Sequence, residues 1–459
     1  MKLIFILIIT LTLLVACGDS TDSENDLPLE TPEIVETLEL IEPEELVENV
    51  ENVENGENEE DIATLDILDI HIEEEQPQFI YIPPEDRVIH EQFFDSAEHL
   101  IENIRVGWNL GNTFDAVPWD DNMFSMLPTE LETIWGNPIT TFETIATVSY
   151  AGFDVLRVPV TWHKALYDDD YNIRADWMER ITEVVNYGLQ NNMVVILNTH
   201  HDERIFTFLD DGLDESLRAF TAIWQQISAH FADYSHMLIF EGLNEPRTPG
   251  SPAEWSGGTA EERHNINIFN QLFVDIVRAS GGNNGDRILM VPTHAAAISD
   301  ITFADFVLPT DIAENRLIVS LHTYAPYFFA LHVGNDSVDT WSADNANDRN
   351  QVIWGLDMAY DTFVSNGIPV IIGEMGAVNR DNTESRAEWA NFFARAAKDI
   401  NIPVVWWDNG GLGLSLNPGD GENFAIIDRN NNTQLFPEII AALIAGTEED
   451  YWVFSGMSQ

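Results

Sequence analysis

Two carboxylic acids, Glu245 and Glu374, stand where short apolar stretches of the chain end. Glu245 follows the run that begins at Leu238, and Glu374 closes the run that begins at Val370. An acid delivered by a buried strand is costly unless it has a partner or a use, and two such acids in one fold suggest a facing pair. A facing pair of carboxyl groups is the minimum machinery for breaking a glycosidic bond.

Other polar or aromatic side chains gather at the ends of similar apolar runs. Seven of eight runs end in such residues: Asn109 and Asn112, Arg157 with Trp162, His200 and His201, Asn244 and Glu245, His322 with Tyr324, Glu374, and Trp407 with Asp408. In a parallel barrel the carboxyl ends of the strands share one face, and the loops after them form the site. The spacing predicts that these side chains converge on the two acids.

The elements that must position them alternate after about residue 95. Eight apolar runs are typical of buried parallel strands, at 104–109, 155–160, 194–198, 238–242, 287–292, 317–321, 369–373 and 403–407. Helices are predicted between them, for example at 177–190, 216–231, 266–278 and 386–398. Eight strands with helical crossovers predict an α/β fold, the (β/α)₈ TIM barrel. A doubly wound open sheet is the alternative, but residues 107–112 lack the G-x-G-x-x-G spacing of its phosphate-binding turn.

Arg157 lies inside one of the predicted strands. A lone charge in a barrel interior is costly, so its guanidinium must reach the barrel mouth or a carboxylate. If Arg157 lies near Glu374 it would keep that acid ionised, whereas a like charge nearby would raise the pKa of Glu245 and hold it protonated.

These residues together resemble glycoside hydrolase family 5, the cellulase family, over about residues 95–445. The motif Asn244-Glu245-Pro246 after a strand is joined, in the right order, by Arg157, His200, His322-Thr323-Tyr324, Glu374 and Trp407. Further motifs resemble the branch that holds endoglucanases and xyloglucanases: residues 107–115, Trp135-Gly136-Asn137-Pro138, residues 322–327 and residues 407–410.

The resemblance implies a retaining mechanism in which Glu245 is the acid/base and Glu374 the nucleophile. Tyr324 and His322 would orient Glu374, and Asn244 would hold the sugar 2-hydroxyl. His200 would bond the sugar or a neighbouring polar group, and Trp407 rather than Trp406 would face the ring at the cleavage site. His201, Asn109, Asp115, Trp135 and Trp162 are further candidates, the two tryptophans for outer subsites.

The function expected is endo-acting cleavage of β-1,4-glucan, with xyloglucan, mixed-linkage glucan and mannan as alternative substrates within the family. Two other classes fit a barrel of this kind. One is a metal-dependent hydrolase, since several histidines and Asp408 lie at strand ends, but it would leave both glutamates idle. The other is a non-catalytic glycan-binding lipoprotein, which two intact carboxylates disfavour. No cofactor and no metal are expected.

The start of the chain reads as an export signal. Residues 1–16 carry Lys2 and an apolar run too short to span a bilayer, and Leu14-Val15-Ala16-Cys17 resembles a bacterial lipobox. The resemblance implies lipid on Cys17, the only cysteine of the chain, and therefore a cell-surface lipoprotein anchored to the membrane through that lipid. Ordinary secretion is the alternative.

Acidic residues dominate the composition, with a formal net charge of -59. Residues 17–90 hold about twenty-five acids and one arginine, so they are expected to form a disordered tether before a single catalytic domain at 91–459. Nucleic acid is excluded as a partner because it requires basic patches. A neutral β-glucan is the expected partner, and no protein partner is implied. Lysine occurs only as Lys2, Lys164 and Lys398, which fits an alkaline or salty exterior.

Overall fold

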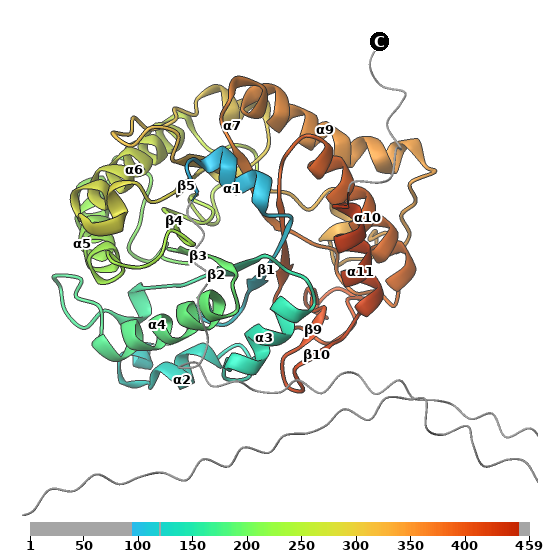
Figure 1. The fold of residues 1–459 in the computed structure, drawn as a ribbon, viewed down its shortest axis with the longest axis horizontal. Coiled ribbons are helices and arrows are strands. Elements are labelled where there is room, and N and C mark those ends of the chain that lie inside the picture. The colour runs from blue at the N-terminus through green and yellow to red at the C-terminus, as the bar shows by residue number, and fades with distance from the viewer. Residues whose placement is uncertain (1–93, 119–120, 449–459) are drawn as a thin grey trace, which may run out of the picture. The chain divides into compact units, whose positions relative to one another are not determined.

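A closed barrel of eight parallel strands forms the centre of the catalytic domain, and helices surround it (Figure 1). The computed structural model describes residues 94–118 and 121–448. The barrel strands are β1 (Val106–Leu110), β2 (Val155–Val158), β3 (Val194–Asn198), β4 (Leu238–Glu241), β5 (Leu289–Ala297), β6 (Leu317–His322), β7 (Val370–Met375) and β8 (Val404–Asp408). Each strand pairs with the next, and β1 pairs with β8. The TIM barrel prediction is confirmed, and the open-sheet alternative is wrong.

Each predicted apolar run contains one barrel strand, and most boundaries differ by one or two residues. The strand β5 is the exception, because it continues five residues beyond Pro292 and its register with β6 shifts there. Ala295 and Ala296 adopt positive φ angles of 53° and 49° within this irregular segment. Such backbone is unfavourable for alanine and was not visible in the apolar pattern.

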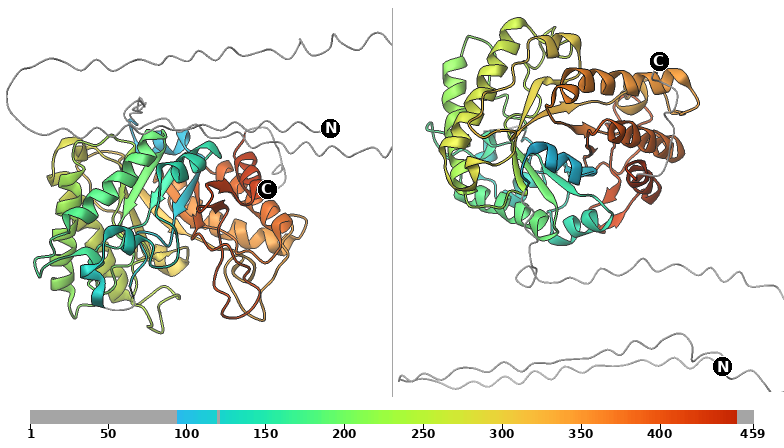
Figure 2. Two further views of the ribbon diagram at one scale, coloured as in Figure 1. Left: turned by 90° about the horizontal axis from the view of Figure 1, so that it is seen from below. Right: turned by 45° about the horizontal axis from the view of Figure 1, so that its top comes forward.

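The helices surround the strands in the two further views of Figure 2. They are α1 (Ala97–Asn103), α2 (Pro128–Glu132), α3 (Phe142–Tyr150), α4 (Ala175–Gln190), α5 (Leu213–His230), α6 (Ala260–Ala279), α7 (Asp300–Ala304), α8 (Tyr327–Ala330), α9 (Ala346–Thr362), α10 (Thr383–Asp399) and α11 (Pro437–Gly446). The four long helices predicted from three- and four-residue spacing are present as α4, α5, α6 and α10. A capping box between Thr259 and Glu262 begins α6. Within the described ranges, none of the helices has the length and apolar character needed to cross a membrane.

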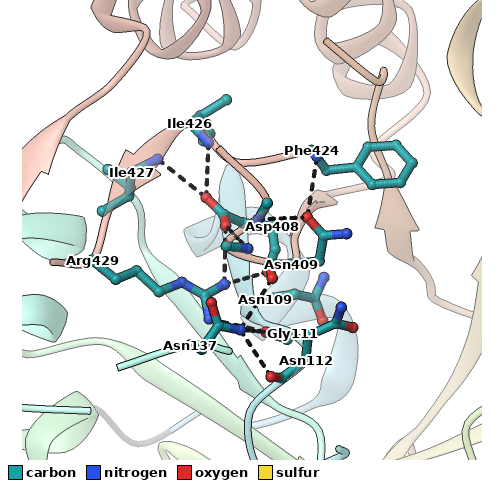
Figure 3. A network of polar contacts seen from close by, with 12 residues as sticks. Asn109, Gly111, Asn112, Asn137, Asp408, Asn409, Phe424, Ile426, Ile427 and Arg429 are labelled. Carbon is teal, nitrogen blue, oxygen red and sulfur yellow. Dashed lines mark hydrogen bonds and ion pairs between the residues drawn. The ribbon is translucent and has the colours of Figure 1, made fainter. Parts of the chain in front are cut away.

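Asp408, the last residue of β8, anchors the seam where the barrel closes (Figure 3). Its carboxylate accepts hydrogen bonds from the Trp108 indole and from the backbone of Ile426 and Ile427, and it pairs with buried Arg429 at 2.9 Å. Arg429 also donates to the carbonyl of Gly111, so the pair ties the ends of β1 and β8 together. Asp408 is therefore a structural residue.

Asn137 stands in the motif Trp135-Gly136-Asn137-Pro138, and it fixes the same seam from outside the barrel (Figure 3). Its amide nitrogen donates to the carbonyl oxygens of Gly111, Asn112 and Asn409, which follow β1 and β8. These bonds hold the loops on which the site residues of both strands depend.

Three sequence predictions fall wholly or partly outside the described residues. These are the signal peptide at 1–16 with the lipidated Cys17, the acidic linker at 17–90, and the outermost residues of the domain at 91–459.

Candidate active site

The two acids predicted from the sequence lie side by side at the carboxyl ends of β4 and β7. One oxygen of Glu245, one oxygen of Glu374 and one ring nitrogen of His322 all lie within 4.8 Å of one another. A retaining glycosidase requires carboxyl groups about 5–5.5 Å apart, whereas an inverting enzyme needs about 6.5–9.5 Å to fit a water molecule. The spacing of this pair suits the retaining geometry.

Arg157 on β2 is the hub of the site. Residues Asn109 and Arg157 are paired across β1 and β2, which places both side chains at one level of the barrel. The guanidinium donates to Glu374 at 2.9 Å, to Asn109 at 2.9 Å, to Asn244 at 2.7 Å and to Glu241 at 2.8 Å. The expectation that Arg157 needs a carboxylate is met twice over, by Glu374 and Glu241.

Glu241, the last residue of β4, is a buried member of the site that the sequence reasoning missed. Its carboxylate accepts hydrogen bonds from Ser320 at 2.5 Å and Asn198 at 3.0 Å, besides its ion pair with Arg157. Burial lowers the pKa of Arg157, but Glu241 and Glu374 outweigh that effect and raise it above the ordinary value. An acid four residues before Glu245, within the same apolar run, was the available signal.

The two carboxylates have different partners. Glu374 has both oxygens held, one by Arg157 and the other by the Tyr324 hydroxyl at 2.9 Å. Glu245 contacts His322 Nδ1 at 2.9 Å, while the same nitrogen stays 3.7 Å from Glu374. Tyr324 thus orients Glu374 as expected, whereas His322 hydrogen-bonds Glu245 instead.

The cellulase family model, glycosyl hydrolase family 5, matches residues 119–413. The chain belongs to this family. It is therefore a glycoside hydrolase of the cellulase type, and its site residues stand in the order that the sequence motifs indicated.

Known members of the family align with three quarters of the chain. Endoglucanase B of Neocallimastix patriciarum is 40% identical over 352 residues, which is 76% of this chain and 72% of that protein. Cellulase/esterase CelE of Acetivibrio thermocellus is 44% identical, but the alignment covers only 40% of its length. The structure of a GH5-4 broad specificity endoglucanase from Ruminococcus champanellensis with bound cellotriose has a TM-score of 0.71 and 43% identity, and the match covers 76% of this chain and 98% of that one.

Arg247, two residues beyond Glu245, is a second family-site residue that the sequence reasoning missed. Its guanidinium lies 3.6 Å from the Glu245 carboxylate and donates to the Glu245 carbonyl at 2.9 Å. It also pairs with Glu254 at 3.1 Å and lies 4.5 Å from the centre of the Trp255 ring. The loop after β4 thus places a positive charge beside one acid of the pair.

The pKa values of the two acids shift in opposite directions. Burial raises the pKa of Glu245, but the hydrogen bond to His322 and the charges of His322 and Arg247 outweigh it and leave the value below the ordinary one. Burial raises the pKa of Glu374, the Glu245 charge adds to the increase, and His322, Arg157 and Tyr324 only partly oppose it. The expected order, with Glu374 ionised and Glu245 protonated, is wrong for the ligand-free site, because His322 bonds Glu245 and burial outweighs Arg157 at Glu374.

Trp407 and His200 form an aromatic wall beside the acids. Their rings are parallel, 5.8 Å apart and inclined by 3°. Trp406 instead lies in the core, where its indole donates to the carbonyl of Phe424. The choice of Trp407 over Trp406 agrees with this geometry.

His200 is positioned to donate rather than accept. Asn198 donates to its Nδ1, because the Asn198 oxygen is already bound to a backbone N–H, so the ring proton resides on Nε2. Burial lowers the pKa of His200 well below its ordinary value, which keeps the ring neutral.

The remaining candidates divide into exposed and buried groups. His201 was expected to face away from His200 along an extended strand, but β3 ends at Asn198 and the two rings lie 4.5 Å apart. Trp135 is 36% exposed and its ring lies 6.0 Å from that of His201, so it remains a subsite candidate. Trp162 is fully buried and donates to a backbone carbonyl, so its proposed subsite role is wrong.

Asn109 and Asp115 act on the scaffold. The Asn109 amide donates to the carbonyl oxygens of Gly373 and Trp406 while its oxygen accepts from Arg157. Asp115 accepts from the backbone N–H groups of Asn112 and Thr113, although its carboxylate also lies within 4.8 Å of ring nitrogens of His200 and His201. Asn109 therefore supports the Arg157 network and does not point at the substrate.

Proposed function

We propose that this enzyme is a retaining endo-β-1,4-glucanase, with Glu374 as the nucleophile and Glu245 as the acid/base. The observation that carries the proposal is the pair of carboxylates within 4.8 Å, one of them fixed through both oxygens by Arg157 and Tyr324. A nucleophile must be held in line with the anomeric carbon, which suits Glu374. The acid/base must exchange protons with water, which suits Glu245, whose side chain is 16% exposed against 7% for Glu374.

The reaction takes two displacements. Glu374 attacks the anomeric carbon, the bond to the leaving oxygen breaks, and Glu245 gives that oxygen its proton. Water then attacks the glycosyl-enzyme, gives a proton to Glu245 and releases Glu374 as a carboxylate. Asn244 accepts from Arg157 through its oxygen, so its amide N–H₂ is available for the sugar 2-hydroxyl.

The opposite pKa shifts provide a pH range in which the pair holds a single proton. In the ligand-free site that proton favours Glu374, whereas the first step needs it on Glu245. The positive charge that develops on the sugar beside Glu374 stabilises its carboxylate and drives the proton to Glu245 in the transition state.

Replacement of each acid tests the assignment. Glu374→Gln should lower kcat on soluble β-glucan by several orders of magnitude, because the covalent route is lost. With azide, Glu374→Gly should yield an α-glycosyl azide by direct displacement, and Glu245→Gly a β-glycosyl azide from the glycosyl-enzyme. The opposite anomers would exchange the two roles, and full activity of Glu374→Gln would overturn the proposal.

Endo-cleavage and breadth of substrate are supported by the relatives. Besides the GH5-4 broad specificity endoglucanase, a lichenase from Caldicellulosiruptor sp. F32 matches with a TM-score of 0.72 and 38% identity over 79% of this chain. Xyloglucan, mixed-linkage glucan and mannan are therefore alternative substrates. Product sizes and anomers from a panel of these soluble polymers identify the substrate, and release of only monomer or dimer from chain ends would contradict endo-cleavage.

We further propose that the enzyme is carried to the cell surface as a lipoprotein, with cleavage before Cys17 and lipid on its sulfur. The support is the sequence Leu14-Val15-Ala16-Cys17 after an apolar run. Lipid would hold the enzyme near the membrane, where released oligosaccharides could be imported. Full-length enzyme should enter the detergent phase on phase separation and Cys17→Ala should not. Equal partition of both proteins into water would favour ordinary secretion.

A further inference from the structure

A groove outside the catalytic centre lies between the loop that follows β6 and the helix α9. Its volume is about 600 Å³, and it is lined by Pro326, Tyr327, Asn347, Asn350, Gln351 and Trp354. Tyr327 is 52% exposed and Trp354 is 58% exposed, which is unusual for large aromatic side chains unless they contact a ligand or partner.

One wall of this α9 groove is a single face of the helix. Asn347, Asn350, Gln351 and Trp354 are spaced by three and four residues, so their side chains line up along α9. The face thus combines three carboxamides with one indole.

The other wall holds Tyr327, the first residue of α8. Phe328 contacts its ring edge-on at 5.3 Å, and the ring of His332 lies 5.3 Å away on another side. The Tyr327 hydroxyl is also 3.3 Å from His332 Nδ1. The ring is therefore supported in position, so little side-chain entropy is lost when a ligand covers it.

The chemistry of the lining selects a neutral, hydroxyl-rich ligand. None of the residues that line the α9 groove carries a charge, although the chain has a formal net charge of -59. Carboxamides both donate and accept hydrogen bonds, as hydroxyl groups do, and aromatic rings offer flat apolar surface with a polar edge. The apolar faces and equatorial hydroxyls of β-linked glucose units match both properties.

We propose that the α9 groove binds a segment of neutral β-1,4-linked glucan at a distance from the bond being cleaved. This inference rests on the proposed glucanase function for the identity of the sugar. The groove is only three residues along the chain from Tyr324, which hydrogen-bonds Glu374. A polymer held there keeps further glycosidic bonds near the catalytic pair and raises their effective concentration.

The direct test measures binding in an enzyme that cannot cleave. Glu374→Gln and Glu374→Gln/Trp354→Ala are compared by native electrophoresis in gels that contain hydroxyethylcellulose. Loss of the indole should weaken retardation by the polymer about three- to tenfold. The matched control is Glu374→Gln/Tyr150→Ala, which removes an aromatic ring of similar exposure, 67%, from α3. Equal retardation of all three proteins would overturn the proposal.

Kinetics on substrates of two lengths separate this site from the catalytic one. Trp354→Ala and Gln351→Ala in the active enzyme should raise KM on hydroxyethylcellulose severalfold while leaving kcat/KM on an aryl cellotrioside unchanged. A parallel loss on the short substrate would place the groove within the cleavage site and overturn the proposal. So would a wild-type dimer that Trp354→Ala dissociates with no change in polymer retardation, because the face would then be an interface between two copies. Activity of Glu374→Gln itself would contradict the glucanase mechanism, whatever the gels show.

Discussion

At the scale of single residues, the environment differentiates two chemically identical carboxyl groups. Glu374 is held by Arg157 and Tyr324, whereas Glu245 contacts His322 and has Arg247 nearby. These partners, together with burial, separate the pKa values of the pair. Arg247 has the largest influence that can be removed without touching either acid or its hydrogen bonds to His322 and Tyr324.

Arg247→Gln should shift the pH–activity profile toward higher pH. The Arg247 charge favours an ionised Glu245 and lowers its pKa, so its removal raises the pKa of the pair and both limbs of the bell-shaped kcat/KM profile move upward. Arg247→Lys retains the charge and should stay near the wild type. Arg105→Gln, just before β1 at the other end of the barrel, is the control. A downward shift for Arg247→Gln would contradict the argument.

Lys164 should make folding stability depend on alkaline pH. It is fully buried, donates to the Ala116 carbonyl and lies 4.7 Å from the Trp177 ring centre, and burial lowers its pKa to about 7. The unfolded chain therefore holds the Lys164 proton up to about pH 10.4 and the folded chain releases it near 7. The free energy of unfolding should rise by about 4 kcal/mol between those pH values from this residue alone.

Denaturant unfolding of wild type and Lys164→Met at pH 6.5 and pH 9.5 isolates this contribution. The difference between the two proteins should change with pH in the direction stated, since all other groups cancel. An unchanged difference would mean that Lys164 titrates alike in both states.

At the scale of secondary-structure elements, strand register assembles the site. Asn109 pairs with Arg157 across β1 and β2, and Asn198 pairs with Glu241 across β3 and β4. Side chains from four neighbouring strands thus reach one level of the barrel interior. The Arg157 guanidinium satisfies two acids and two carboxamides there, so the charges are buried together and not singly.

Arg157→Met should destabilise the fold as well as abolish activity. Removal of one partner leaves Glu241 and Glu374 buried without their cation, which costs about 3–5 kcal/mol. Arg105→Met breaks the half-exposed pair with Asp154 and should cost under about 1 kcal/mol. Chemical denaturation of both variants supplies the comparison. Similar losses in the two would show that the Arg157 network adds no more than a surface ion pair.

At the scale of the whole molecule, charge is the dominant property. The chain has 79 acidic and 20 basic residues, so the folded domain repels itself and cationic partners are favoured over anionic ones. Ions screen such repulsion over distances of about 10 Å at 0.1 M salt and about 3 Å at 1 M.

Sodium chloride should therefore raise the thermal stability of the enzyme. An increase from low salt to about 0.5 M is expected to raise Tm by a few degrees, because it shields acid–acid repulsion more than it weakens the buried ion pairs. Sucrose of equal osmolarity serves as the control in the same calorimetric scans. A fall in Tm with salt would indicate that attractive surface pairs outweigh the net repulsion.

The amino-acid sequence by itself determined the barrel and most residues of its site. Eight short apolar runs with polar ends allow few other folds, because each run is long enough for one buried strand and each polar end must meet the others at one rim. Glu245, Glu374, Arg157 and Tyr324 were predicted on that basis, and the structure brings them together.

Tertiary structure alone decided which partner each group has. The buried acid Glu241, the bond from His322 to Glu245 and the burial of Trp162 depend on the register between strands that are far apart in the chain. The scaffold roles of Asn137, Asp408 and Arg429 likewise exist only once β1 meets β8. Local sequence patterns specify which residues are buried, whereas closure of the barrel fixes the atoms that they meet.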